Sequence, residues 1–550
     1  MSAGAGGAQP TGGMDLAAQR RFGERVAARV EEARGALLPR LLAKDPSLWV
    51  EGEREGREVV DRLGWLDLPA SMEAHLADVE AFAAEVREAG FRRVLLLGMG
   101  GSSLAPDVYA RMAGDARGLR LAVVDSTHPD AVLAAEEAGD LATTFFIVSS
   151  KSGSTVESNA LAAYFLSRTG GRGAQFAAIT DPGSPLQRLG AERGFRRVFV
   201  NPPDVGGRFS ALSLFGLVPA ALAGVDVRRV LTSARESAAG CREWGAAGQR
   251  AARLGALMAC GVDAGRDKLT VLAPEAFEPF GAWAEQLVAE STGKGGTGVL
   301  PVIGEPADAV AYGDDRAFVA LLPPGDAAAP LERRVSALAK SGFPALALAL
   351  DPASGLGAAF YEWEVATALC GAWLKLNPFD QPNVAESKAN TDRVLQRFAA
   401  GEASPPAAPG LPPDLGERVG AWLASLDAGF YAAVLAYVAP SPQHDALLAG
   451  LRAAIAAAAV VPVTVGYGPR FLHSTGQLHK GGSPRAAFLQ LETEPERDVE
   501  VPGQAYSFGR LALAQALGDL EALERRGRRV LRLRVRAADL AAAVDLLARA

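Results

Sequence analysis

Three short segments of the sequence combine glycine, hydroxyl and basic residues in a way that suits an anionic ligand. They are "GMGGSS" (98–103), "SSKSGST" (149–155) and "NPPDVGGRFS" (201–210), and each follows a short apolar run. Glycines let the backbone approach a ligand closely, and the free N–H groups at the start of a helix attract negative charge. A tight turn alone would account for the first segment, and an ordinary helix cap would account for the second. Their occurrence together favours a phosphate site.

Two charged residues could carry out proton transfer next to such an anion. Arg208 follows two glycines, so its guanidinium could turn inward and stabilise a developing oxyanion. In "WAEQLVAESTGKGG" (283–296), Gln286 and Glu290 are four residues apart and share one helix face. Glu290 directly precedes a glycine-rich loop, where a desolvated carboxylate could act as a base. Taken singly, each could also be an ordinary surface residue.

Two later segments add a lysine and a pair of histidines. The loop "NPFDQPNVAESK" (377–388) is rich in turn-forming residues and ends at Lys388. The segment "LHSTGQLHKGG" (472–482) contains His473 and His479, two of the five histidines in the chain. A single histidine is more often structural than catalytic. A pair in a loop flanked by glycines indicates a function more strongly.

The elements that must position these residues are short apolar strands alternating with helical patterns. One group of expected strands covers 92–100, 119–127, 143–150, 174–181 and 196–201, and a second covers 267–274, 299–306, 316–324 and 344–352. Strands that alternate with helices predict an α/β fold with two doubly wound parallel sheets. Ligands of such sheets bind outside the carboxyl ends of the strands, which is where the three segments lie.

The chain divides into five expected parts. They are a leader (1–13) with an N-terminal helical region to residue 90, a first phosphate-binding domain (91–240), a second α/β domain (241–400), a Pro-rich linker (401–416) and a C-terminal α/β domain (417–550). The N-terminal region shows helical periodicity in 16–42 and 72–90.

Composition excludes several classes of function. The chain has 550 residues, a formal net charge of −7 and no basic tract, so we expect no nucleic-acid partner. No apolar run is long enough to cross a bilayer, and no signal segment is expected. The three cysteines are far apart, without metal-ligand spacing, which predicts a reduced, cytoplasmic protein without a metal site.

Taken in order, these motifs resemble those of the glucose-6-phosphate isomerase family. "QLVAESTGK" is similar to the family's Q-x-x-x-E-S-x-G-K segment, and "FDQPNVAESK" to its F-D-Q-x-x-V-x-x-x-K signature. The resemblance spans about residues 90–390 and implies two sugar-isomerase (SIS) domains. Segments within 44–66 and 467–482 resemble the branch found fused behind a transaldolase. We expect any transaldolase partner here to be a separate chain.

The resemblance implies a role for each matched residue. The substrate phosphate would be held by Gly101, Ser102, Ser150, Lys151, Ser152 and Thr155, with Gly207 also at the substrate. Arg208 would stabilise the enediolate, and Glu290, with Gln286 nearby, would move the proton between C2 and C1. Lys388 and a histidine would assist ring opening. The implied reaction interconverts glucose 6-phosphate and fructose 6-phosphate, in glycolysis and gluconeogenesis, with no cofactor. There are two alternatives: an isomerase that also accepts mannose 6-phosphate, and a non-catalytic sugar-phosphate sensor.

The chain departs from the family at the ring-opening histidine. In most members this residue lies between the base and the lysine, in a Q-L-x-H-Q-G-like stretch, but no histidine lies between Glu290 and Lys388. "GQLHKGG" is the nearest local match, so the resemblance assigns the role to His479, with His473 as the alternative. The family is usually a homodimer whose histidine reaches the partner's site. The different order of segments leaves the oligomeric state of this chain open.

Overall fold

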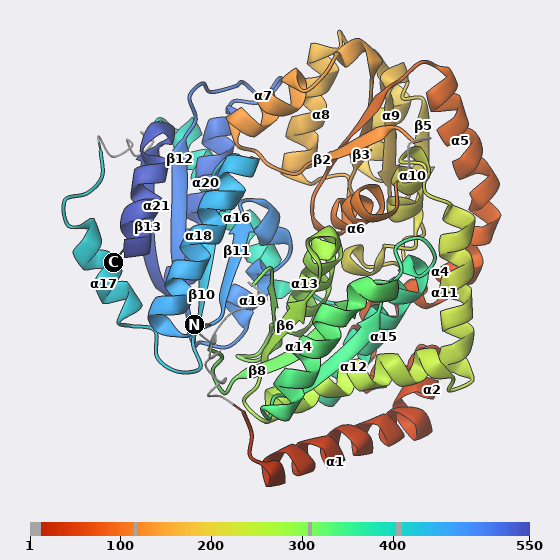
Figure 1. Cartoon of the computed structure of the whole chain (residues 1–550). Helices are drawn as coiled ribbons and strands as arrows, with labels where there is room; N and C mark the ends of the chain where they lie inside the picture. Colours follow the sequence, from red (N-terminus) through yellow and green to blue (C-terminus); the bar gives the residue numbers. More distant parts are fainter. Residues whose placement is uncertain (1–12, 115–117, 306–310, 403–409, 550) are drawn as a thin grey trace, which may run out of the picture.

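The computed structural model describes residues 13–114, 118–305, 311–402 and 410–549. Most of the expected leader (residues 1–12) and part of the expected linker (403–409) lie outside this part. The N-terminal region is helical, as predicted, with α1 (Leu16–Glu32), α2 (Leu38–Leu42), α3 (Glu53–Val60), α4 (Leu68–Ser71) and α5 (Leu76–Glu88). Helix α1 lies along the outside of the second domain, against α12 (Ala246–Asp263) (Figure 1).

The first domain is a five-stranded parallel sheet in the order β2-β1-β3-β4-β5. Its strands are β1 (Arg93–Gly98), β2 (Arg120–Val124), β3 (Thr144–Ser149), β4 (Phe176–Thr180) and β5 (Arg197–Val200). Its helices are α6 (Leu104–Val108), α7 (Pro129–Glu137), α8 (Val156–Arg168), α9 (Pro185–Glu192) and α10 (Leu214–Leu222). β3 and β4 are buried along their whole length, because helices cover both faces of a doubly wound sheet.

The second domain repeats this plan with a four-stranded parallel sheet in the order β7-β6-β8-β9. The strands are β6 (Lys268–Leu272), β7 (Leu300–Ile303), β8 (Arg316–Leu322) and β9 (Ala345–Ala349). Besides α12, the helices are α11 (Val227–Arg242), α13 (Glu278–Thr292), α14 (Ala329–Lys340), α15 (Leu356–Trp373) and α16 (Pro382–Ala399). The two predicted doubly wound sheets are therefore confirmed.

The C-terminal domain has a third parallel sheet, in the order β11-β10-β12-β13. Its strands are β10 (Tyr431–Tyr437), β11 (Val463–Tyr467), β12 (Ala486–Glu494) and β13 (Arg529–Arg536), and its helices are α17 (Leu415–Leu423), α18 (Pro442–Ala459), α19 (Gly476–Gly481), α20 (Phe508–Arg525) and α21 (Leu540–Arg549). In each of the three sheets the first strand of the domain lies between the second and the third. Strands β10 and β11 were not predicted from the sequence.

The three domains meet around α13, α16 and α19. Helix α19 packs against both α13 and α16, and α16 packs along α20 of the C-terminal domain. In Figure 1 the C-terminal domain (blue) lies on one side of this junction, while the first (orange to yellow) and second (green) domains lie on the other. The residues predicted to do chemistry come from all three domains and converge at this junction.

Helix α15 buries an acid whose carboxylate is unpaired. Glu364 is 0% exposed, and neither carboxylate oxygen has a hydrogen-bond partner among the described residues. Burial raises the pKa of Glu364 well above its ordinary value, so the folded protein keeps this group neutral. Glu362, two residues earlier, is instead paired with Arg250 and bonded to Ser237.

Replacing Glu364 by glutamine is expected to stabilise the protein increasingly as pH rises. In the unfolded chain a glutamate loses its proton near pH 4.3, whereas the folded protein retains it, so wild-type stability falls as pH rises above that value. The variant lacks this dependence of the free energy of unfolding on pH, which amounts to at most about 1.4 kcal/mol per pH unit. Chemical unfolding at pH 5 and pH 7 would measure it. As a control, Glu362→Gln breaks an ion pair and should destabilise the protein. If the stability of wild type and of Glu364→Gln depended on pH in the same way, the prediction would be wrong.

Candidate active site

The register of the first sheet brings two of the predicted loops together. β1 pairs with β3 so that Gly98 lies opposite Ser149, and the loops that follow them leave the sheet side by side. Gly100 has φ of +54°, a conformation that favours glycine. A Cβ on Gly101 would lie 2.0 Å from the carbonyl oxygen of Gly207, so the third loop also packs directly on the first. The three predicted loops therefore form one surface.

The serine loop presents hydroxyl groups at the start of α8. Ser150 donates a hydrogen bond to the Thr155 hydroxyl over 3.0 Å, and Thr155 is the N-cap residue of the 13-residue helix. The Thr155 side chain makes no capping hydrogen bond to the first turn within the described chain, so amide donors of α8 remain available to an anion. The Lys151 ammonium contacts the Asp181 carboxylate and donates to the Pro203 carbonyl over 2.8 Å. Its charge is thus already paired with Asp181, the residue that follows β4.

Arg208 and Glu290 meet in the buried centre of the site. Glu290 is 6% exposed, and Arg208 Nη1 lies 3.4 Å from its Oε1 atom. Gln286 donates to Glu290 Oε2 over 3.2 Å from one turn earlier on α13, as the four-residue spacing predicted. Burial lowers the pKa of Arg208, and the Glu290 and Asp380 charges oppose that effect. A carboxylate therefore lies against a fixed positive charge in a site largely closed to water.

Packing and hydrogen bonds hold Arg208 in this orientation. The neighbouring Phe209 ring stacks on Trp65 of the N-terminal region, with ring centroids 5.2 Å apart, and lies 5.2 Å from Phe379. Arg208 donates through Nε to Ser291 Oγ (2.8 Å) and through Nη2 to the Asp380 carbonyl (2.8 Å). The "FDQ" loop is thus clamped on the arginine.

Lys294 lies beside this pair, although the sequence analysis gave it no role. Burial and the nearby Arg208 charge lower the pKa of Lys294 to about 8, and the Asp380 carboxylate opposes this. Its ammonium contacts Asp380 Oδ1 at 2.5 Å and donates to the Asp380 carbonyl over 2.7 Å. Lys294 therefore fixes the same loop that Arg208 clamps.

His473, not His479, lies at the site. Gln286 donates to the His473 carbonyl over 2.7 Å, and a Cβ on Gly100 would lie 3.0 Å from the His473 Cβ. His479 is 2% exposed, its Nδ1 atom bonds to the Tyr431 hydroxyl over 3.0 Å, and its ring packs on Phe488. Burial, with the charges of Lys480 and Arg528, lowers the pKa of His479 well below its ordinary value. The geometry thus favours the alternative histidine of the sequence analysis.

His473 shares a small cavity with Lys388 and an acid that the sequence analysis missed. His473 Nε2 lies 2.9 Å from Oε1 of Glu157, in the first turn of α8, and these two residues line a cavity of about 80 Å³ with Lys388. Burial alone would raise the pKa of Glu157, but the charges of His473 and Lys388 and the His473 hydrogen bond lower it overall. The acid could have been inferred from its place in the first turn after the serine loop.

An ion pair between a half-buried arginine and a buried aspartate holds the His473 segment on the first domain. Arg470, one turn before His473, donates to both carboxylate oxygens of Asp125, over 2.6 and 2.9 Å. Burial lowers the pKa of Arg470, but Asp125 and Asp107 outweigh that effect and raise it. Gln477 continues the anchoring by donating to the Gly293 carbonyl over 3.0 Å. The C-terminal domain thus supplies His473 to a site built by the other two domains of the same chain.

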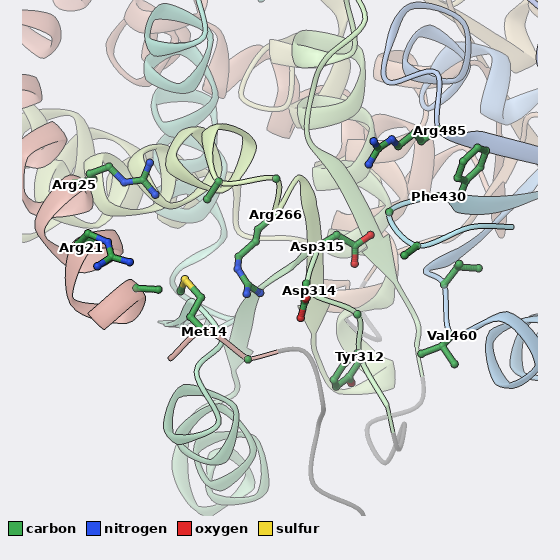
Figure 2. Close-up of a pocket in the computed structure, with 18 of the residues that line it drawn as sticks. Met14, Arg21, Arg25, Arg266, Tyr312, Asp314, Asp315, Phe430, Val460 and Arg485 are labelled. Atoms are coloured by element: carbon green, nitrogen blue, oxygen red, sulfur yellow. The ribbon is translucent and has the colours of Figure 1, made fainter. Parts of the chain in front are cut away.

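A larger cleft lies elsewhere. It measures about 1250 Å³ and is lined by residues of α1, the second domain and the C-terminal domain. Figure 2 shows Arg21, Arg25, Arg266 and Arg485 around it, together with Asp314 and Asp315. None of the predicted site residues lines this cleft. The volume of a cleft alone would therefore not have identified the predicted residues.

The fold and the site together define an α/β protein with paired SIS domains. No protein-family model matches the chain. Over 397 residues the chain is 30% identical to the glucose-6-phosphate isomerase of Rubrobacter xylanophilus, a match that covers 61% of this chain and 90% of that protein. It is 32% identical over 254 residues to the glucose-6-phosphate isomerase of Carboxydothermus hydrogenoformans, covering 42% of this chain and 53% of that protein. The chain therefore belongs to the glucose-6-phosphate isomerase family.

Solved structures support the fold. A hypothetical protein of Thermus thermophilus superposes with a TM-score of 0.56 at 24% identity, covering 70% of this chain and 97% of that one. A glucose-6-phosphate isomerase of Chlamydia trachomatis superposes with a TM-score of 0.53 at 19% identity, covering 70% and 87%.

Proposed function

We propose that this protein interconverts glucose 6-phosphate and fructose 6-phosphate through an enediolate. The observation that carries the proposal is the buried Glu290 carboxylate against Arg208, beside the three loops that suit a phosphate. A coupled assay of fructose 6-phosphate conversion by the wild-type protein tests it. Turnover is the expected result, and no conversion in either direction would refute the proposal.

The first chemical step is opening of the sugar ring. The C1–O5 bond breaks while the C1 hydroxyl loses a proton and O5 gains one, which leaves an aldehyde at C1. We assign the proton donor for O5 to His473, because it lies at the site and carries Glu157 on its other side. Lys388 lines the same cavity and supplies positive charge there. A positioned acid of this kind contributes on the order of 10²–10⁴-fold.

Isomerisation then needs a single base. Glu290 removes the C2 proton, the electron pair moves into the C1–C2 bond, and O1 becomes the enediolate oxygen. Arg208, fixed by its contacts to Ser291 and Asp380, stabilises that charge without reorganising. The O2 proton passes to O1, and Glu290 returns its proton to C1, which gives the ketose. The remote phosphate supplies binding energy that orients this end of the sugar.

Removing the hydroxyls of the serine loop is expected to weaken substrate binding. The double variant Ser150→Ala, Thr155→Ala should raise KM by roughly 10²-fold, because each lost hydrogen bond to a charged phosphate is worth about 1.5–3 kcal/mol. Ser167→Ala is the control, since Ser167 is exposed on the last turn of α8, at the opposite end of the helix from the serine loop. Steady-state kinetics would measure both variants. An unchanged KM in the double variant would remove the phosphate from this loop.

We further propose a cytoplasmic protein whose site does not require a partner subunit. The three cysteines are free and buried, which suits a reducing compartment. His473 comes from the same chain as Glu290, so a homodimer would not be needed to complete the site. A functional link to a separately encoded transaldolase rests on the sequence resemblance alone. Among the described residues, no helix has the length and apolar character needed to cross a membrane.

A further inference from the structure

A buried chain of hydrogen bonds joins the first domain to the C-terminal domain behind His473. Thr127, which follows β2, donates to Gln515 Oε1 on α20 over 2.6 Å. Gln515 Nε2 donates to Glu157 Oε1 over 2.7 Å, and that same oxygen lies 2.9 Å from His473 Nε2. Thr127, Gln515 and Glu157 are all at most 3% exposed. Water therefore competes little with these bonds.

The order of donors and acceptors along this chain is determined by its members. An ionised carboxylate only accepts hydrogen bonds, so Gln515 must turn its NH₂ group toward Glu157 and its carbonyl toward Thr127. The Thr127 hydroxyl can donate to that carbonyl, which opposes a flip of the amide. With Glu157 as the acceptor, neutral His473 carries its proton on Nε2. Its Nδ1 atom is then left as the basic nitrogen.

We propose that Gln515, held by Thr127, is a positioning residue that keeps Glu157 as the acceptor for His473 and so sets the protonation of the ring-opening histidine. This inference rests on the proposed function, in which His473 acts on the sugar ring. Glu157 Oε2 has no hydrogen-bond partner among the described residues, so Gln515 and His473 supply the donors to this carboxylate. Hydrogen bonds to the ionised form of an acid favour that form.

Two substitutions at position 515 should have different effects. Gln515→Met keeps the side-chain volume but removes the donor, which makes the ionised form of Glu157 less stable and should lower the pH midpoint of the His473 titration. Gln515→Glu places a second carboxyl group next to Glu157. Because two buried carboxyl groups in contact hold a proton between them, the new side chain can still donate to Glu157, and the midpoint should move less. In Gln515→Met kcat should fall by on the order of tenfold, part of the 10²–10⁴-fold that a positioned acid contributes. Thr127→Val should act like Gln515→Met, more weakly.

A second buried glutamine of the same domain provides the matched control. Gln490 is 0% exposed and donates to the carboxylate of Glu492 (2.9 Å) and the Ala516 carbonyl (3.0 Å), with no link to Glu157. Gln490→Met should lower thermal stability while the His473 midpoint and the pH profile of kcat/KM stay as in the wild type. A role of Gln515 in packing alone would give the same pattern in Gln515→Met.

The decisive measurement is an NMR titration of the histidine rings in the full-length protein. Only five histidines are present, and loss of one signal in His473→Asn assigns it. A lower midpoint in Gln515→Met, with a smaller change in Gln515→Glu, supports the inference. An unchanged midpoint in folded Gln515→Met overturns it. Because the titration needs no turnover, an inactive wild-type protein would refute the proposed function without deciding this result.

Discussion

Glu290→Gln is expected to lower kcat by roughly 10³-fold or more while the protein remains folded. Glutamine has nearly the same shape and can keep a contact with Gln286, but it cannot accept the C2 proton. Arg208 would remain clamped by Ser291 and the Asp380 carbonyl, so the rest of the site should be preserved. The coupled assay gives kcat, and exchange of the C2 proton with deuterated solvent reports the proton step directly. KM should change little, because the phosphate loops are untouched.

The neighbouring acid Glu285 is the control for this experiment. Burial raises its pKa to about 8, with the Arg470 charge opposing, and a strongly raised pKa is often taken as a sign of a catalytic acid or base. On a helix, however, adjacent residues point about 100° apart, so Glu285 cannot share the face of Gln286 and Glu290. Glu285→Gln should therefore keep proton exchange within a few-fold of wild type. If Glu290→Gln instead kept its activity and Glu285→Gln lost it, the base would be Glu285.

The motifs of the first two domains were predictable because each rests on a local pattern. Apolar runs ended by Gly, Pro, Asp, Asn or Ser identified β1 to β9, and parallel sheets place the ends of such strands on one side. The spacing of Gln286 and Glu290 was enough to put both on one helix face. These features depend on residues close in sequence, so their geometry can be deduced without the rest of the fold.

The C-terminal sheet was harder to predict. β10, "YAAVLAY", is buried along its whole length, so it shows no alternation, and its alanines suit a helix equally well. β11 is short and runs directly into the segment that carries the histidines. An apolar run without periodicity does not distinguish a buried strand from a buried helix. Contacts with distant parts of the chain decide whether such a run forms a strand or a helix.

The partners of His473 illustrate why the full site could not be read from sequence. Glu157 and Gln515 are separated by 358 residues, and Arg470 and Asp125 by 345. Local similarity favoured His479, because its neighbours match a familiar pattern, but burial against Tyr431 and Phe488 is set by the third sheet. His479 as the ring-opening histidine remains a sequence-based prediction, whereas the geometry of the site favours His473.

His473→Ala is expected to lower kcat for both cyclic sugars by about 10²-fold or more, whereas His479→Phe should remain active. An acid that protonates a ring oxygen must carry a proton near neutral pH. Burial and nearby positive charges lower the pKa of His479 well below its ordinary value, so it is neutral there. His473 instead lies 2.9 Å from the Glu157 carboxylate and lines the cavity that Lys388 also lines.

The two variants should also differ in the property that they impair. His479→Phe removes the hydrogen bond to Tyr431 within a buried aromatic cluster, so thermal unfolding should shift to lower temperature with kcat nearly unchanged. His473→Ala also removes a donor from the buried Glu157 carboxylate, so it too should unfold at a lower temperature, but its kcat should fall even where the protein is fully folded. Exchange spectroscopy of the anomers of glucose 6-phosphate would show whether ring opening is the lost step. If His479→Phe abolished anomer exchange and His473→Ala preserved it, the sequence-based assignment would be correct, and the cavity shared by His473, Glu157 and Lys388 would need another role.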